Sequence, residues 1–170
     1  MFKPFLLSIF FSFGILFCDS RDCPDNFVPN PQFTGGVNQD ECYPEDFVYY
    51  SSTRQGFYMF LEVVINDFQI SGDDWVAAFD EEGNCAGAQQ LTIFDGQAYI
   101  NLAIYGDDPL TPNVDEGMND GENFFLVIYD DSEDAYLIYS ESFSGWFNNN
   151  GAPMPPWNDP SVVFNFPTTF

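Results

Sequence analysis

The sequence predicts an all-β protein: a single-domain antiparallel β-sandwich, Ig-like or jelly-roll-like, with a disulfide-stapled N-terminal extension. Roughly eight or nine short segments alternate between apolar and polar residues with the period of two that strands show. Turn residues separate these segments, and none of them shows a sustained helical period of apolar residues. Hydrophobic residues make up 45% of the chain and aromatic residues 19%, which is enough for a packed core.

The first part of the chain, residues 1–20, is typical of a signal peptide. A basic start that ends at Lys3 is followed by an apolar run from Pro4 to Phe17, which is too short for a comfortable bilayer span. Small residues at Cys18 and Ser20 fit cleavage after Ser20. Acylation of Cys18 is the alternative, which the bulky Phe17 disfavours. We therefore expect a secreted protein, extracellular or at the cell surface, with no transmembrane segment in the mature chain.

The second part, residues 21–45, is a segment bracketed by cysteines and rich in Pro, Gly and Asn, so we expect it to be irregular. In an exported chain, Cys23 and Cys42 are expected to form a disulfide. Closing a loop of this size contributes about 3 kcal/mol in the chain-entropy model. Cys85 is then left over, and we expect it to be a free thiol at an apolar hairpin. Other pairings of these three cysteines stay open at this point.

The third part, residues 46–170, is the predicted sandwich domain, and a hairpin over residues 73–88 is central to it. Residues 75–79 are apolar on both alternating faces, which predicts a strand with both faces buried and places Trp75 in the core. Gly83 is expected to take a positive φ in the turn. The small residues 86–88 allow another layer to approach closely.

The other strands of this domain follow at regular spacing. They are expected at residues 47–50, 57–65, 91–94, 98–105, 124–129, 136–139 and 162–166. Asp95-Gly96 is a strong signal for a tight hairpin turn, and residues 130–134 supply a second hairpin turn. Short strands at this spacing predict a sandwich of two antiparallel sheets.

Charge and composition exclude several classes of function. The chain has 27 acidic and 3 basic residues, no histidine and a formal net charge of −24. Almost nothing is available to neutralise phosphates, so nucleic acid is excluded as a partner and an anionic membrane surface is disfavoured. The absence of histidine removes Ser-His-Asp and Cys-His arrangements and HExxH zinc sites. We therefore expect no enzyme activity, although a small carboxylate-dependent glycoside hydrolase remains an alternative, since paired carboxylates can hydrolyse glycosides.

The acidic loop of residues 106–122 is the candidate metal site. Its candidate ligands are Asp107, Asp108, Asp115, Glu116, Asp120 and Glu122. Oxygen ligands from such a loop can wrap Ca²⁺, with backbone carbonyls completing the shell, so calcium is the candidate cofactor. The spacing does not match an EF-hand. The alternative is an exposed loop whose prolines and glycines only shape turns. A second acidic cluster at residues 130–134 is explained by turn chemistry alone.

Aromatic residues near the C-terminus form a candidate carbohydrate site. The residues concerned are Trp146, Trp157 and Tyr139, with Phe147 beside them in a segment rich in Gly, Asn and Pro. Planar rings displayed on a sandwich can stack on sugar rings while Asn and Asp bind hydroxyl groups. The alternative is that these rings pack the tail against the sandwich, because large aromatic side chains usually serve burial.

Several short motifs follow one another along the mature chain. They include Cys23-Pro24, Glu41-Cys42, Phe47-Val48-Tyr49-Tyr50, Asp73-Asp74-Trp75-Val76-Ala77-Ala78-Phe79, Asn84-Cys85-Ala86-Gly87-Ala88, Tyr105-Gly106-Asp107-Asp108 and Phe125-Leu126-Val127-Ile128-Tyr129-Asp130. In this order they resemble a β-sandwich module that recurs in secreted, often multidomain, bacterial surface and extracellular proteins. The resemblance implies a β-sandwich on the cell exterior.

Together these observations predict a secreted, non-catalytic extracellular module with a structural or adhesive role, with calcium as a candidate stabiliser. A carbohydrate-binding module that uses exposed aromatic rings is the alternative, and the glycoside hydrolase is the second alternative. The expected partner is an extracellular glycan or a surface protein.

Overall fold

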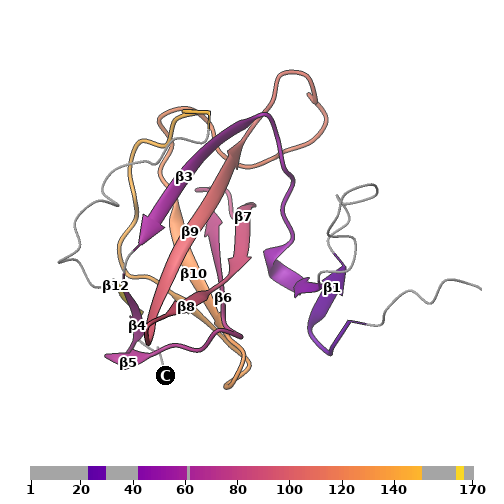
Figure 1. The fold of residues 1–170 in the computed structure, drawn as a ribbon. Coiled ribbons are helices and arrows are strands. Elements are labelled where there is room, and N and C mark those ends of the chain that lie inside the picture. Colours follow the sequence, from indigo (N-terminus) through magenta and orange to yellow (C-terminus); the bar gives the residue numbers. More distant parts are fainter. Residues whose placement is uncertain (1–22, 30–41, 61, 151–163, 167–170) are drawn as a thin grey trace, which may run out of the picture.

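The computed structural model describes residues 23–29, 42–60, 62–150 and 164–166 (Figure 1). Within these ranges the chain is almost entirely strands and loops, apart from one short 3-10 turn, η1 (Glu45–Phe47). The strands are β1 (Phe27–Pro29), β2 (Cys42–Pro44), β3 (Arg54–Phe60), β4 (Val63–Ile65), β5 (Phe68–Gln69), β6 (Trp75–Phe79), β7 (Cys85–Gln90), β8 (Thr92–Phe94), β9 (Gln97–Gly106), β10 (Phe125–Asp130), β11 (Ala135–Ile138) and β12 (Phe164–Phe166). The predicted signal peptide lies outside the described residues.

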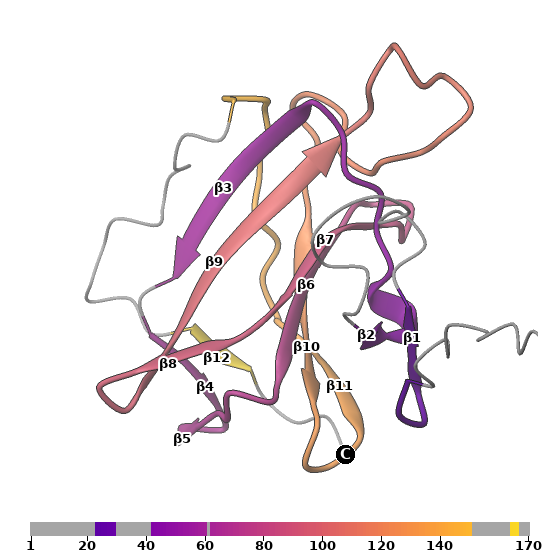
Figure 2. The same cartoon turned by 45° about the vertical axis from the view of Figure 1, so that its right-hand side comes forward.

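Two sheets enclose the main core (Figures 1 and 2). One has the strand order β11-β10-β6-β7 and the other β3-β9-β8, while a small sheet, β12-β4-β5, lies at one end. All ladders between these strands are antiparallel except the one between β4 and β12. Inward side chains of both large sheets form one cluster, in which Phe60, Ile100 and Ile128 are fully buried. This arrangement confirms the predicted all-β antiparallel sandwich.

The two large sheets meet where β7 lies against β9. A β-carbon on Gly87 would lie 2.0 Å from the carbonyl oxygen of Ala103, so only glycine permits this approach. The side-chain amide of Gln89 forms two hydrogen bonds across the same junction when its oxygen and nitrogen are placed to match their partners. Its nitrogen donates to the Asn101 carbonyl oxygen at 2.5 Å, and its oxygen accepts from the Asn101 N–H at 3.2 Å. The close approach predicted for residues 86–88 is confirmed, and the approaching layer is strand β9.

The outer face of the four-stranded sheet carries a second apolar cluster, which the N-terminal extension covers. Its buried members are Tyr43, Phe47, Tyr49, Trp75, Ala77, Ala88, Val127 and Tyr129. Strand β6 is therefore buried on both faces, as its sequence predicts. Burial of each large apolar side chain in such a cluster stabilises the fold by about 1.5–3 kcal/mol, so the extension is a packed part of the domain.

The N-terminal extension is more regular than predicted. Strands β1 and β2 pair as a short antiparallel ladder, in which Val28 lies opposite Tyr43. The predicted disulfide between Cys23 and Cys42 is present, with a Cα–Cα distance of 5.7 Å. Cys85 is a free, partly buried thiol, as predicted, and burial raises its pKa to about 12.

Two predicted strands differ in the structure. Residues 47–50 do not form a strand. Phe47 is the last residue of the 3-10 turn, and its side chain is buried in the second cluster. Burial of the side chain therefore takes the place of pairing with a neighbouring strand. The segment 57–65 is divided, since β3 pairs with β9 while β4 pairs with β5 and β12. Two of the expected turns are confirmed by their backbone angles: Asp95 and Gly96 have φ values of 49° and 80°, and Gly83 has a φ of 93°.

Candidate functional site

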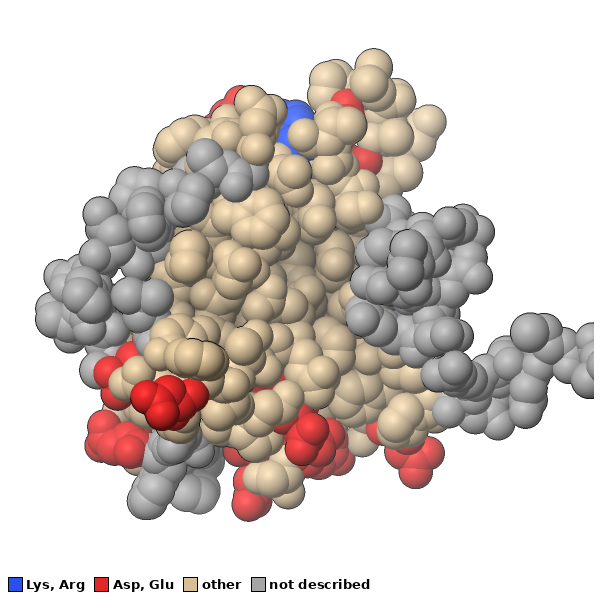
Figure 3. Space-filling model, viewed as in Figure 1, with Lys and Arg blue, Asp and Glu red and all other residues tan. Residues whose placement is uncertain are grey.

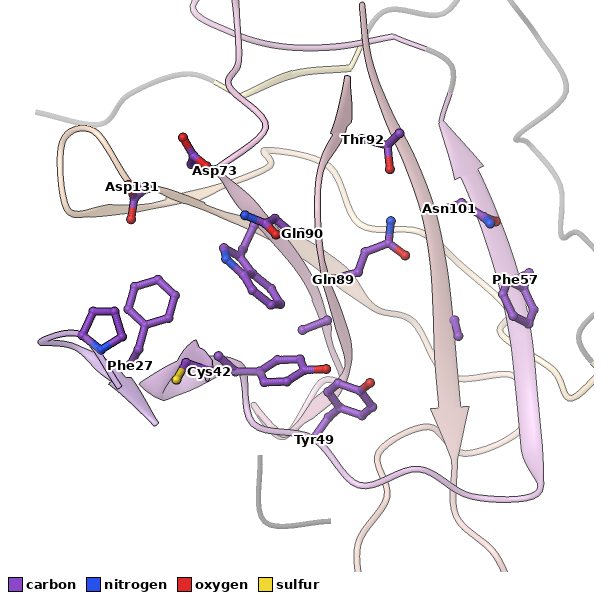
Figure 4. Close-up of a pocket in the computed structure, with 15 residues that line it drawn as sticks. Phe27, Cys42, Tyr49, Phe57, Asp73, Gln89, Gln90, Thr92, Asn101 and Asp131 are labelled. Atoms are coloured by element: carbon purple, nitrogen blue, oxygen red, sulfur yellow. The ribbon is translucent and has the colours of Figure 1, made fainter. Parts of the chain in front are cut away.

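A cleft of about 690 Å³ lies between the N-terminal extension and the place where the two large sheets meet (Figure 4). It exists because two small side chains lie between two large ones across four neighbouring strands. Trp75 on β6 and Phe57 on β3 flank Ala88 on β7 and Ala103 on β9, and all four line the cleft. Phe57 lies directly opposite Ala103 in the ladder between β3 and β9. The alanines therefore leave a depression between two aromatic side chains.

One wall of the cleft is aromatic. The ring centroids of Tyr43 lie 4.9 Å from Trp75 and 5.9 Å from Tyr49. Tyr49 in turn stacks on Tyr105, with a centroid separation of 5.5 Å and an angle of 10° between the ring planes. Burial raises the pKa of the Tyr49 phenol well above its usual range, and the neighbouring Tyr43 and Tyr105 add to this. The wall is thus held in place by ring packing and carries no charge at neutral pH.

Polar side chains face this wall from β7, β8 and β9. Gln89, Gln90, Thr92 and Asn101 all line the cleft (Figure 4). Gln90, Thr92 and Asn101 are exposed. Among the residues that the structure describes, nothing hydrogen-bonds to the side chains of these three. They are therefore available as donors and acceptors for a bound molecule.

Asp73 and Asp131 also line the cleft, and buried Asp74 fixes the loops that carry them. Asp74 is 3% exposed. Its carboxylate accepts the N–H of Ser71 at 2.7 Å and the N–H of Asp131 at 3.1 Å. Burial raises the pKa of Asp74, although these two hydrogen bonds oppose that shift. Asp74 thereby ties the segment before β6 to the turn between β10 and β11.

The cleft has no basic side chain among its described lining residues. Arg54 is the only Lys or Arg in the described ranges, and it is engaged elsewhere. Its guanidinium pairs with Asp120 at 2.6 Å, donates to the Asp107 carbonyl oxygen at 2.9 Å and lies 5.8 Å from the centre of the Trp146 ring. On the face that Figure 3 shows, acidic side chains gather along the lower edge and the middle is mostly uncharged.

Three carboxylates of the predicted metal loop, Asp107, Asp108 and Glu116, accept hydrogen bonds from the loop and from Thr53. Asp108 and Glu116 are buried. Asp108 accepts from the Thr53 hydroxyl at 2.5 Å and from the Leu110 N–H at 2.9 Å, and the Thr53 hydrogen bond chiefly lowers its pKa. Glu116 accepts from the Thr111 hydroxyl and from the Asp108 N–H. Asp107 accepts the Glu116 N–H at 3.1 Å. These carboxylates replace absent backbone partners within the loop.

The remaining predicted ligands are also committed to protein partners. Asp120 pairs with Arg54, and Glu122 accepts the N–H groups of Asn119 at 2.7 Å and Glu81 at 3.3 Å. The structure therefore does not bring the six predicted ligands together as one group, and calcium binding by this loop stays a prediction. The sequence places these residues in one loop but does not show which backbone groups each side chain caps.

Only Asp115 of the six belongs to a group whose carboxylates lie close together. One oxygen each from Asp80, Glu82 and Asp115 lies within 4.8 Å of the others. The Asn84 amide nitrogen donates to Asp80 at 3.0 Å and to Asp115 at 2.9 Å. Burial and the neighbouring carboxylates raise the pKa of Asp115. A cation here requires the Asn84 amide to turn, which would add its oxygen to the three carboxylates.

The predicted carbohydrate residues are not arranged as a platform. Trp146 is fully buried, and a β-carbon on Gly106 would lie 2.2 Å from its ring, so its use as an exposed sugar platform is wrong. The alternative, that Trp146 packs the tail against the sandwich, is the one observed. Tyr139 is half-buried and stacks on Phe143 with centroids 5.8 Å apart. Phe147 is 48% exposed, and Trp157 lies outside the described residues.

The sequence does not identify the cleft, because the residues that line it come from strands far apart in the chain. The available signal is the outward-facing position of Phe57 and Asn101 in their strands, opposite the core face.

Comparison with family models, with curated proteins and with solved structures finds no match to this chain. In the described part of the chain, no helix has the length and apolar character needed to cross a bilayer.

Proposed function

We propose that this chain is a secreted, non-catalytic extracellular module with an adhesive role, and that it binds a glycan in the cleft between the N-terminal extension and the sheets. The observation that carries this proposal is a concave site of about 690 Å³ in which an aromatic wall faces amide and hydroxyl groups. Sugar rings combine an apolar face with a rim of hydroxyl groups. Aromatic rings suit the first and side-chain amides suit the second.

The charge of the protein limits the classes of glycan that the cleft can bind. A nucleic acid or a sulfated glycan would bring negative charge to a chain with a formal net charge of −24. No lining residue in the described ranges is Lys or Arg, so an anionic group would meet no counter-charge. The class of ligand that fits the cleft is therefore a glycan without acidic substituents.

A glycan array probed with the mature chain tests this proposal, followed by titration calorimetry with the best ligand. Asn101→Ala removes a free amide of the cleft, and we expect it to weaken binding about tenfold. Phe57→Ala should weaken binding at least as much, because it removes one aromatic flank. Gln97→Ala is the matched control, since Gln97 is exposed on the same face of β9 but outside the cleft.

The outcome separates the alternatives. Binding that Gln97→Ala preserves and Asn101→Ala weakens supports the cleft as the glycan site. Binding to no glycan, or equal losses in all variants, would contradict it. Release of reducing ends from the bound glycan, measured in the same samples, tests the glycoside hydrolase alternative, for which two carboxyl groups must flank the scissile bond.

A second candidate property is stabilisation by calcium at Asp80, Glu82 and Asp115. These carboxylates come from the turn between β6 and β7 and from the loop after β9. A cation there would join two segments that the Asn84 amide now bridges. Calcium bound there would stiffen the module and would not itself bind the glycan.

A further inference from the structure

We infer that the cleft prefers a glycan that carries protonated amino groups, with an amine bound at the end formed by Asp73 and Asp131. This inference rests on the proposed function and names the class of sugar that the cleft takes. It differs from a general preference for glycans because it assigns selectivity to two particular carboxylates.

The two carboxylates belong to the same end of the cleft. Asp73 directly precedes β6, and Asp131 begins the turn after β10. Figure 4 shows both at the end where Gln90 lies, and Gln90 is the ladder partner of Trp75 at the start of β6. The aromatic wall begins beside them, since Trp75 follows Asp73 by two residues and contacts Tyr43. A sugar on this wall would present its substituents to both carboxylates.

The positions of the two carboxylates are set by the fold. Asp74 accepts the backbone N–H of Asp131 at 3.1 Å and that of Ser71 at 2.7 Å, and its own carbonyl oxygen accepts the Leu91 N–H at 2.9 Å. These three bonds join the segment before β6, the turn after β10 and the residue before β8. Asp73 and Asp131 are thus presented from braced backbone, so an amine would not have to order them first.

The two carboxylates also lack a counter-charge. Neither side chain accepts a hydrogen bond from the described residues, and Arg54, the single base in those ranges, is paired with Asp120. A protonated amine would supply the missing positive charge, whereas an acetylated amine is neutral and would not. Exposed charge pairs are screened by salt, so the preference should shrink as ionic strength rises.

The test compares two probes of matched length, an oligomer of β-1,4-linked glucosamine and its fully N-acetylated form. Binding is measured by calorimetry at mildly acidic pH, where the sugar amine is protonated, and at low and high salt. We expect the glucosamine oligomer to bind about tenfold more tightly at low salt. The double variant Asp73→Asn/Asp131→Asn should lose this preference while keeping its affinity for the acetylated oligomer. Asp95→Asn, an exposed acid in the turn between β8 and β9, is the control.

Each outcome decides between the claims. Equal binding of the two oligomers, unaffected by the double variant, would overturn the amine preference and leave the glycan site intact. An equal loss of preference in Asp95→Asn would also overturn it, because overall charge would then explain the effect. Failure to bind these oligomers or any glycan on the array would overturn the proposed function and the inference with it.

Discussion

Gly87 on β7 lies so close to Ala103 on β9 that a β-carbon on the glycine would be 2.0 Å from the alanine's carbonyl oxygen. This contact joins the two large sheets without a backbone ladder, and the neighbouring Gln89 amide adds two hydrogen bonds to Asn101. The same junction lines the cleft, because Ala88 and Ala103 leave a depression there. The packing of the sandwich and the shape of the candidate site therefore depend on one glycine.

We expect Gly87→Ala to destabilise the protein by about 1–3 kcal/mol, because the added methyl group must push β7 away from β9. The measurement is urea unfolding followed by near-ultraviolet circular dichroism. Gly72→Ala is the matched control, since the nearest atom to its β-carbon would be 3.5 Å away, in ordinary contact with Ile93. Equal stability of the two variants would show that the junction tolerates a wider separation.

The disulfide should matter for both stability and binding. It closes a separation of 19 residues, for which the chain-entropy model gives about 3 kcal/mol. The variant Cys23→Ser/Cys42→Ser should lose about that much and bind glycan more weakly, because Cys42 and Tyr43 line the cleft. Thermal unfolding and calorimetry give the two readouts. Cys85→Ser is the control, since Cys85 is a free thiol. A double variant with unchanged stability would contradict this role for the extension.

Calcium should raise the melting temperature at fixed ionic strength. A ligand that binds only the folded state at about a hundred times its dissociation constant adds about 2.7 kcal/mol. Asp115→Asn should abolish this response, and Asp120→Asn should preserve it, because Asp120 belongs to the same loop but pairs with Arg54. A shift that magnesium or sodium chloride reproduces, or one that survives Asp115→Asn, would rule out a calcium site at this position.

Stability should also depend on pH in a defined direction. The pKa values of Asp74 and Asp115 are raised, chiefly by burial, so the folded state binds more protons than the unfolded chain as pH falls towards the raised values. Stability should therefore rise between neutral and mildly acidic pH. The pKa of Asp108 is lowered, and its contribution should be lost below the ordinary Asp value of about 3.9.

Urea unfolding across this pH range checks the dependence. Asp115→Asn should reduce the rise on the neutral side of the maximum, because an amide cannot take up the proton. Its effect on the acid side should be small. A maximum at neutral pH in both proteins would show that neither Asp74 nor Asp115 controls the profile.

The local features of the fold could be predicted because they depend on neighbouring residues. The two-faced burial of residues 75–79, the Asp95-Gly96 turn and the disulfide all follow from short patterns. The break between β3 and β4 could not be predicted, because both sides of the break are apolar and only the partner strand changes.

The candidate site could not be predicted for a related reason. The cleft needs Trp75 and Phe57 to flank two alanines across four strands, which depends on the sheet order and register. The acidic loop and Trp146 were predicted as sites from their residue types alone. Their roles depend on partners elsewhere: Thr53 and Arg54 bind carboxylates of the loop, and Gly106 leaves room for the Trp146 ring.

The most direct test of the glycan cleft is a titration of the ¹⁵N-labelled mature chain with the oligosaccharide that binds best on the array. Binding is followed through the side-chain amide signals in nuclear magnetic resonance spectra. We expect the signals of Gln89, Gln90 and Asn101 to shift together, since these amides line one cleft. The signals of Asn119 and Asn148, which lie outside it, should stay in place. Shifts confined to Asn148 and its neighbours beside Phe147 would contradict the cleft and return the site to the aromatic tail.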